Sequence, residues 1–301
     1  MQELTLEVNS EVPVGPSSAP GLTVPASLTR LWVLSPVQAA FLSVVPVGLK
    51  CLHLSCSVEG PAEGPSSFLS GMARLQHMTS LDLGLRNRES QGLDWPPAGP
   101  AYSALTASSK LVRLSTWHVK LPAGVWPYVF PASHTLPHLT YLSLSFEGAV
   151  ENAPPSAWGA ADVSSLVACC PNLQMIVDCS VRPGMHVSEL HKLTAFTNLH
   201  VTYGPRSVPS IERSVMGLAA LTQLRCLTVS VLSEDLSVGS LLPLTTLTNL
   251  IDLDFTCARG DDEDSDSDVS DNDSDGGGRD WEVYLTEVST LTACQRVIDS
   301  M

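Results

Sequence analysis

A six-residue pattern, apolar-x-x-apolar-x-apolar, recurs ten times along the 301-residue chain, at steps of about 28 residues, with Thr116 and Asp178 at the last position in two copies. Its last two apolar positions are two residues apart, the spacing that places side chains on one face of a β-strand. A chain built in this way buries the same positions in copy after copy, which requires a stacked array. The first residue of each copy, its anchor, is Met1, Leu28, Leu49, Met78, Leu111, Leu139, Leu173, Phe196, Leu224 or Leu250.

The segments between the copies carry apolar residues at helical spacing. A short strand followed by a returning helix, repeated in one direction, stacks into a solenoid with a parallel sheet. We therefore predict an α/β fold, a curved horseshoe with parallel strands on its concave face and helices on its convex face. One register stays open, because matching FTNL to the later LTNL moves the eighth anchor from Phe196 to Leu199. The clearest helical segments are 65–76, 162–170, 210–223 and 236–248.

These copies resemble the leucine-rich repeat family over nearly the whole chain, in its ribonuclease-inhibitor-like and cysteine-containing forms. Segment 166–176, LVACCPNLQMI, is similar to the cysteine-containing repeats of F-box substrate receptors. Two features depart from the family. Its asparagine eight residues after the anchor occurs only as Asn9, and Cys56 and Cys257 lie one residue before its cysteine position. The resemblance implies a leucine-rich repeat solenoid, and the departures predict an irregular backbone ladder at the turn after each strand.

More than half of the acidic excess lies in one short segment. The formal charge of the chain is −15, and residues 261–275 contain nine Asp and Glu, so the remainder carries −15 + 9 = −6. Such a self-repelling run cannot bury a core. We expect residues 1–257 to form the repeats, 258–280 an acidic disordered insertion, and 281–301 a last helix and a partial C-terminal repeat. Since both ends interrupt a repeat, we also expect the chain to be a fragment.

Composition argues against several kinds of partner. No domain-sized segment has an excess of Lys and Arg, so we expect no nucleic acid. Residues 31–49 carry no charge, but they contain two prolines and repeat positions at both ends, so we expect no membrane span. No secretory signal is visible, and eight cysteines without a CxxC pair predict reduced thiols. We expect a cytoplasmic monomer, with nuclear and cytoskeletal or axonemal locations left open.

No motif for catalysis or for a cofactor is present, so we expect neither enzymatic activity nor a cofactor. One match needs weighing: Asp271, Asp273, Asp275, Gly276 and Glu282 have the spacing of an EF-hand calcium loop. The helix that enters such a loop would have to form from an Asp- and Ser-rich run. We therefore expect no metal site.

The strand residues between the buried positions should point to the open face. One central residue of each copy forms a row, which we expect to be exposed. Aromatic residues and arginine dominate the binding energy of protein interfaces, so we favour these among the row and its flanks. The row is Thr5, Trp32, His53, Asp82, Ser115, Ser143, Val177, His200, Thr228 and Asp254. The candidate partner contacts are Arg30, Trp32, His53, Asp82, Arg113, Trp117, Tyr141, His200, Asp252 and Asp254.

Two longer segments, 91–100 and 119–137, follow strands and are rich in proline and aromatic residues. The second contains Trp126, Tyr128 and Phe130. Two interpretations are open: the aromatic side chains form an exposed contact ridge, or they fold back over the leucines of the solenoid.

The resemblance implies a non-catalytic scaffold that binds a protein partner on the concave strand face. One form of it is a ubiquitin-ligase substrate receptor of the F-box type. The alternatives are a cytoskeletal or axonemal scaffold, and a regulator that resembles the GTPase-activating protein of Ran, which also joins such repeats to an acidic region.

Overall fold

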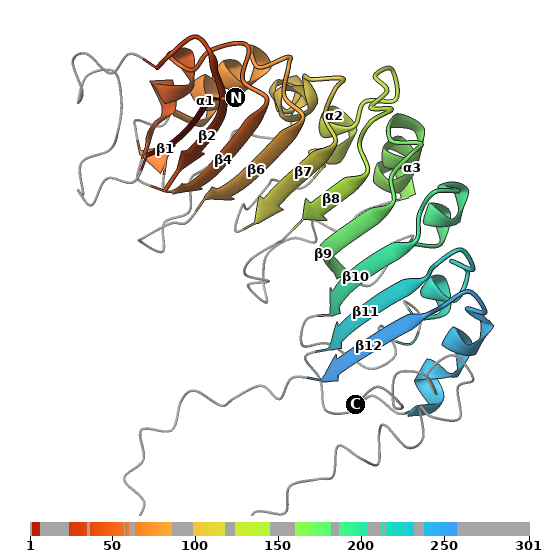
Figure 1. Cartoon of the computed structure of the whole chain (residues 1–301). Coiled ribbons are helices and arrows are strands. Elements are labelled where there is room, and N and C mark those ends of the chain that lie inside the picture. The colour runs from red at the N-terminus through yellow and green to blue at the C-terminus, as the bar shows by residue number, and fades with distance from the viewer. Residues whose placement is uncertain are drawn as a thin grey trace, which may run out of the picture.

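The computed structural model describes residues 2–6, 24–34, 37–56, 58–59, 64–85, 99–117, 124–144, 160–181, 187–203, 212, 215–231 and 238–257. Ten strands form one sheet in which neighbours are parallel and follow one another in chain order. Figure 1 shows this sheet as a curved array (Figure 1). The strands are β1 Gln2–Leu6, β2 Leu28–Val33, β4 Cys51–Cys56, β6 Ser80–Leu85, β7 Arg113–Trp117, β8 Tyr141–Leu144, β9 Met175–Val181, β10 Asn198–Tyr203, β11 Cys226–Val231 and β12 Asp252–Cys257.

The ten copies of the sequence pattern are these ten strands, so the predicted α/β solenoid is confirmed. From β4 onward every strand begins two residues after its anchor, as Cys51 follows Leu49. In the eighth copy Asn198 pairs with Cys226, which puts Phe196 level with Leu224. The alternative anchor Leu199 is therefore wrong.

A regular set of backbone hydrogen bonds joins the turns that lead into the strands. In nine copies, from Leu28 to Leu250, the amide of the anchor donates to the carbonyl three residues before it. The carbonyl of the residue after the anchor then accepts amides from the next copy. That of Thr79, for example, accepts from Val112 at 2.8 Å and from Arg113 at 3.1 Å. This turn ladder runs through the carbonyls of Thr29, Lys50, Thr79, Val112, Thr140, Gln174, Thr197 and Arg225.

The regular ladder therefore lies before the strands. The irregular ladder that we expect after them falls almost wholly outside the described residues. In the first copies a separate two-stranded parallel sheet follows the strands, formed by β3 Val37–Gln38 and β5 Val58–Glu59. The sequence pattern does not predict this second sheet.

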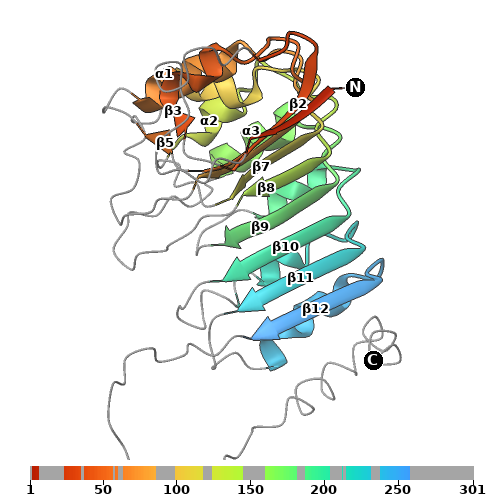
Figure 2. The ribbon, with the colours of Figure 1, turned by 60° about the vertical axis from the view of Figure 1, so that its left-hand side comes forward.

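Helical segments cover one side of the main sheet (Figure 2). Segments 65–76 and 162–170 form α1 and α3, as predicted, whereas 236–248 forms the 3-10 helix η4. Pro243 lies inside η4, and its missing amide hydrogen and ring disfavour an α-helix there. Of 210–223, residues 215–218 are helical. The helices are η1 Ala39–Ser43, α1 Gly64–Ala73, η2 Pro100–Thr106, α2 Trp126–Val129, α3 Ala160–Cys169, η3 Val187–Lys192 and η4 Val238–Thr246.

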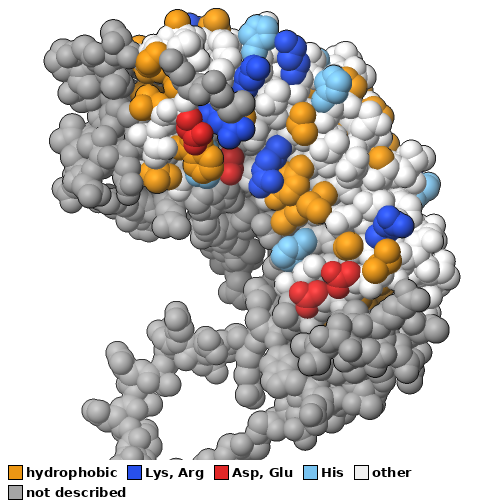
Figure 3. All heavy atoms as spheres, viewed as in Figure 1, with side chains coloured by type: hydrophobic (Ala, Val, Ile, Leu, Met, Phe, Trp, Pro, Cys, Tyr) orange, Lys and Arg blue, Asp and Glu red, His pale blue; other side chains and the backbone are white. Residues whose placement is uncertain are grey.

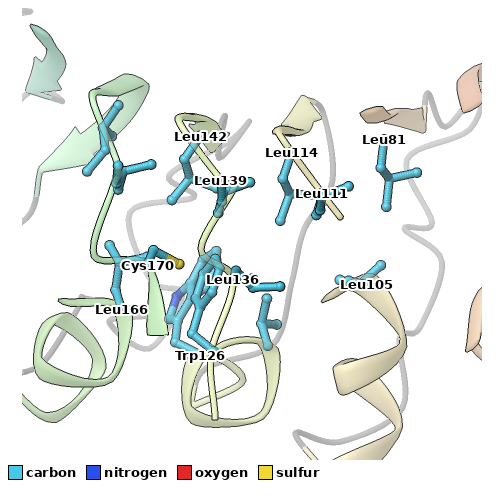
Figure 4. Packing of buried hydrophobic residues seen from close by; sticks show 14 of the residues in the cluster. Leu81, Leu105, Leu111, Leu114, Trp126, Leu136, Leu139, Leu142, Leu166 and Cys170 are labelled. Carbon is cyan, nitrogen blue, oxygen red and sulfur yellow. The ribbon is translucent and has the colours of Figure 1, made fainter. Parts of the chain in front are cut away.

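The core is one continuous layer between the sheet and the helices. Figure 4 shows Leu111, Leu114, Leu139 and Leu142 pointing from the strand side toward the helical layer (Figure 4). The first two apolar positions of the pattern are buried in every copy from β2 to β12. Burial of this kind stabilises each repeat only against its neighbours.

Several predicted features lie outside the described residues: the insertion 258–280, the last segment 281–301, the calcium-loop residues from Asp271 to Glu282, and Asn9. Within the described part of the chain, no helix has the length and apolar character to cross a bilayer. The uncharged stretch 31–49 contains the end of β2, then β3 and η1.

Candidate protein-binding face

The side of the sheet opposite the helices presents two rows of outward side chains, because residues alternate along each strand. The strand pairing aligns both rows across the ten strands. The first row is Glu3, Arg30, Cys51, Ser80, Arg113, Tyr141, Met175, Asn198, Cys226 and Asp252. The second row is the predicted central row, from Thr5 to Asp254.

One irregularity interrupts the rows at β9. Leu199 of β10 pairs with Ile176 and Val201 pairs with Cys179, so two residues of β9 lie opposite His200 alone. This is the geometry of a β-bulge, which bends a strand and increases its local twist. The second row therefore steps sideways between Val177 and His200.

Three side chains at the start of the second row contact one another. The ring centroids of Trp32 and His53 are 4.9 Å apart, with 32° between the ring planes. His53 Nδ1 lies 2.9 Å from Asp82 Oδ2. Trp32 is 40% exposed, while the side chains of His53 and Asp82 are about one fifth exposed. The pairing places them on β2, β4 and β6 in sequence, so neighbouring copies build this cluster together.

Arg113 and Tyr141 form a second cluster, in the first row. The guanidinium carbon of Arg113 lies 3.8 Å from the ring centroid of Tyr141, a cation–π contact between adjacent strands. Arg113 is exposed and Tyr141 half-buried. The stacking orients the guanidinium while leaving it accessible.

The prediction of exposure is wrong for two members of the second row. Ser115 and Ser143 are each only 4% exposed. They follow Arg113 and Tyr141 by two residues on the same strands, and a serine is too short to rise above these stacked side chains. The middle of the second row therefore offers little polar surface to a partner.

The remaining candidates lie on the same sheet but not in one cluster. Arg30 on β2 and His200 on β10 are half-buried, and Asp252 and Asp254 on β12 are exposed. Trp117 pairs with Gly84 at the end of β7, and its side chain lies outside the described residues. Figure 3 shows basic side chains (blue) among apolar ones (orange) over the first strands, with acidic side chains (red) both there and over the last strands (Figure 3).

Two of the three aromatic side chains in 119–137 fold back over the solenoid, the second of the two interpretations above. Trp126 and Phe130 are buried and stack on each other, with centroids 5.9 Å apart and 7° between the planes. Only Tyr128, at 39% exposure, remains accessible, and it lies on the helical layer. No aromatic contact ridge forms there.

Buried titratable groups lie between sheet and helices, away from the open face. The hydrogen bond from its neighbour lowers the pKa of the Cys169 thiol, while the same bond and burial raise that of Cys170. Burial also raises the pKa of Tyr102 well above its usual value. Cys51, Cys169, Cys170 and Cys226 are free thiols. The described part of the chain contains no group of three or more His, Cys, Asp or Glu that could hold a metal ion.

The partner contacts predicted from the sequence do not include three residues that the strand pairing places beside them. Cys51 and Ser80 fill the first row between Arg30 and Arg113, and Lys50 stands exposed at its border. Counting two residues on from each anchor would identify this row, since all its members occupy that position.

Fold and open face together define a solenoid of the leucine-rich repeat type, with one side of a parallel sheet available for contacts. No model of a known protein family matches the chain, and a search of curated proteins finds no match.

Proposed function

We propose that the chain is a leucine-rich repeat protein that serves as a non-catalytic scaffold and binds a protein partner across the open strand face. The observation that carries this proposal is the exposed Trp32, whose ring contacts that of His53, in a face that the described helices leave uncovered. An ordered aromatic side chain loses little conformational entropy on binding and offers a large contact area.

The arrangement of Arg113 on Tyr141 supports the same use. An arginine side chain that is already stacked in the free protein loses less conformational entropy when it forms hydrogen bonds with a partner. Both clusters lie on strands from β2 to β8, so a partner seated there would touch several consecutive repeats. Solenoids use such extended concave surfaces for binding.

Among scaffolds, we propose a substrate receptor of the F-box type as the first form to test. The supporting feature is segment 166–176, in which Leu166, Cys169, Cys170 and Leu173 are all buried at the junction of α3 and β9. Co-purification with a Skp-type linker protein would favour this form. Stimulation of a GTPase would instead favour the regulator that resembles the Ran GTPase-activating protein.

The test of the scaffold is affinity capture with the full chain, followed by identification of the proteins retained. We expect Trp32→Ala to weaken capture of the specific partner about tenfold or more, as truncation of an interface hot spot does. The matched control is Tyr128→Ala, which removes an equally exposed aromatic residue from the helical side and should leave capture unchanged. Unchanged capture by the double variant Trp32→Ala with Trp117→Ala would exclude the strand face as the binding surface.

A further inference from the structure

We propose that the first half of the open face binds an extended acidic peptide with two carboxylates four residues apart. The inference rests on the proposed function and names the chemistry of the partner. The site is the arginine strip: Arg30, Cys51, Ser80 and Arg113, four consecutive members of the first row on β2, β4, β6 and β7.

The strip has a cation at each end and small residues between. Arg30 pairs with Cys51, Cys51 with Ser80, and Ser80 with Arg113, so the four side chains lie side by side across four strands. Cys51 and Ser80 are half-buried and too short to keep a backbone away from the sheet. Lys50, exposed at the border of the strip beside Cys51, adds a third positive charge.

These cations are not neutralised by carboxylates of the described chain. No ion pair joins Arg30, Lys50 or Arg113 to any described Asp or Glu, although Glu3 is the next member of the row beyond Arg30. The nearest acid in the second row, Asp82, is bonded to His53 at 2.9 Å. The strip is therefore complementary in charge to an acidic ligand.

The spacing of the two arginines selects the ligand. Three strand intervals of about 4.8 Å separate them, so their backbones lie about 14 Å apart across the sheet. An extended peptide rises about 3.3 Å per residue, so four residues span about 13 Å. An even spacing also puts both acidic side chains on the same face of the peptide, whereas a spacing of three or five puts them on opposite faces.

Each end of the strip has a feature that favours a peptide over a lone anion. Arg113 is held over Tyr141, which orients its planar guanidinium for a bidentate contact with a carboxylate. At the other end Trp32 stands exposed two residues after Arg30 on the same strand and offers an apolar surface to a flanking residue. The ligand chemistry is thus two carboxylates with an apolar neighbour.

The experiment measures binding of fluorescent peptides to the full chain by anisotropy. One peptide carries Asp-x-x-x-Asp, a second Asp-x-x-Asp, and a third Asn-x-x-x-Asn, all with the same small spacer residues. We expect the first to bind most tightly and to lose affinity as salt is raised, because the contacts are ionic. Arg30→Gln and Arg113→Gln should each weaken binding about three- to tenfold, between the effect of an exposed ion pair and that of a charged hydrogen bond.

The matched control is Arg225→Gln, at an exposed arginine immediately before β11 and outside the strip, and this variant should bind as the unchanged chain does. Equal affinity for the first two peptides, or no effect of either strip variant, would overturn the proposal. So would tighter binding of a single-stranded oligonucleotide of matched charge, or self-association abolished by Arg113→Gln.

The acidic run 261–275 of the chain itself is another ligand that could fill the strip. A variant in which its Asp and Glu are replaced by Asn and Gln tests this. If only this variant binds the first peptide, the acidic run of the chain itself fills the strip, and a partner in trans is excluded. Capture that depends on Trp32 but not on Arg30 or Arg113 would overturn the acidic ligand and leave the scaffold standing. Capture that depends on none of these three residues would overturn both the acidic ligand and the binding of a partner on the strand face.

Discussion

Polar side chains at the turns of this solenoid, both buried and exposed, donate hydrogen bonds to carbonyl oxygens of neighbouring repeats. Ser108 occupies an inward position that leucine fills elsewhere, and its hydroxyl lies 2.6 Å from the carbonyl oxygen of Met78. Two asparagines that precede anchors act in the same way. Asn172 donates to Pro137 and Asn249 to Thr222, each at 2.8 Å. Single residues thus add bonds between copies in the turns that lead into the strands.

The buried Tyr102 makes the stability of the protein depend on pH. Its ring is fully buried, and burial raises its pKa above the usual value near 10, because the phenolate would have to leave water. The unfolded chain then loses this proton at lower pH than the folded chain, so stability falls as pH rises above about 10. The contribution is up to about 1.4 kcal/mol for each pH unit.

Urea unfolding between pH 8 and 11 checks this. The free energy of unfolding should fall less steeply with pH in Tyr102→Phe than in the unchanged chain. Tyr128→Phe, at an exposed tyrosine, should keep the original slope. Parallel slopes for all three proteins would show that Tyr102 titrates normally.

Among the elements, the helical layer varies most from copy to copy. Its described part contains two ten-residue α-helices, a four-residue one, the helical residues 215–218 and several 3-10 helices, whereas every strand from β4 onward begins two residues after its anchor. The contact between α1 and η1 is especially close: a Cβ on Gly71 would lie 2.6 Å from Leu42 Cβ. Such a distance is far below van der Waals contact, so only glycine allows these helices to approach as they do.

Gly71→Ala should therefore destabilise the protein by about 1–3 kcal/mol, the usual cost of overpacking, although alanine is the better helix former. Chemical unfolding monitored by circular dichroism measures this change. Gly48→Ala is the matched control, since a Cβ there meets nothing within 4 Å. A stability gain in Gly71→Ala would show that the two helices move apart without cost.

In the whole molecule, contacts connect each strand mainly to the next. β12 pairs with β11 alone in the described sheet, whereas β8 lies between β7 and β9. Stability of such an array is approximately a sum over repeats and their interfaces, and parts of it open locally. A defect at one end should therefore stay at that end.

Hydrogen exchange tests this expectation with two leucines at equivalent inward positions. Leu253→Ala in β12 should remove protection from β12 and β11 while β4 to β7 keep theirs. Leu142→Ala, fully buried in β8, should lower the global free energy of unfolding by about 2–5 kcal/mol. Loss of protection throughout the sheet in Leu253→Ala would mean that the solenoid unfolds as one unit.

The strands, their inward leucines and the two outward rows could be predicted from the sequence, because each depends on local alternation and a repeated anchor. The exposure of Ser115 and Ser143 could not, since it depends on the length of side chains on neighbouring strands. The bulge opposite His200 does disturb the hydrophobic pattern: Asp178 stands at the last apolar position of that copy, and Val201 pairs with Cys179, one residue further on. The stacking of Arg113 on Tyr141 required the register between copies.

The turn ladder has a consequence for how this chain can change over evolutionary time. The ladder uses only main-chain atoms, so the side chains of its eight carbonyl-bearing residues can differ. They include threonine, lysine, valine, glutamine and arginine. Proline is the one residue type that each donating position must reject, because it has no amide hydrogen. Anchors are 21 to 34 residues apart in the sequence, yet each returns to the same edge. Insertions can thus accumulate on the far side of a repeat without disturbing the turn ladder that joins one copy to the next. Substitutions on the open face likewise leave the ladder intact.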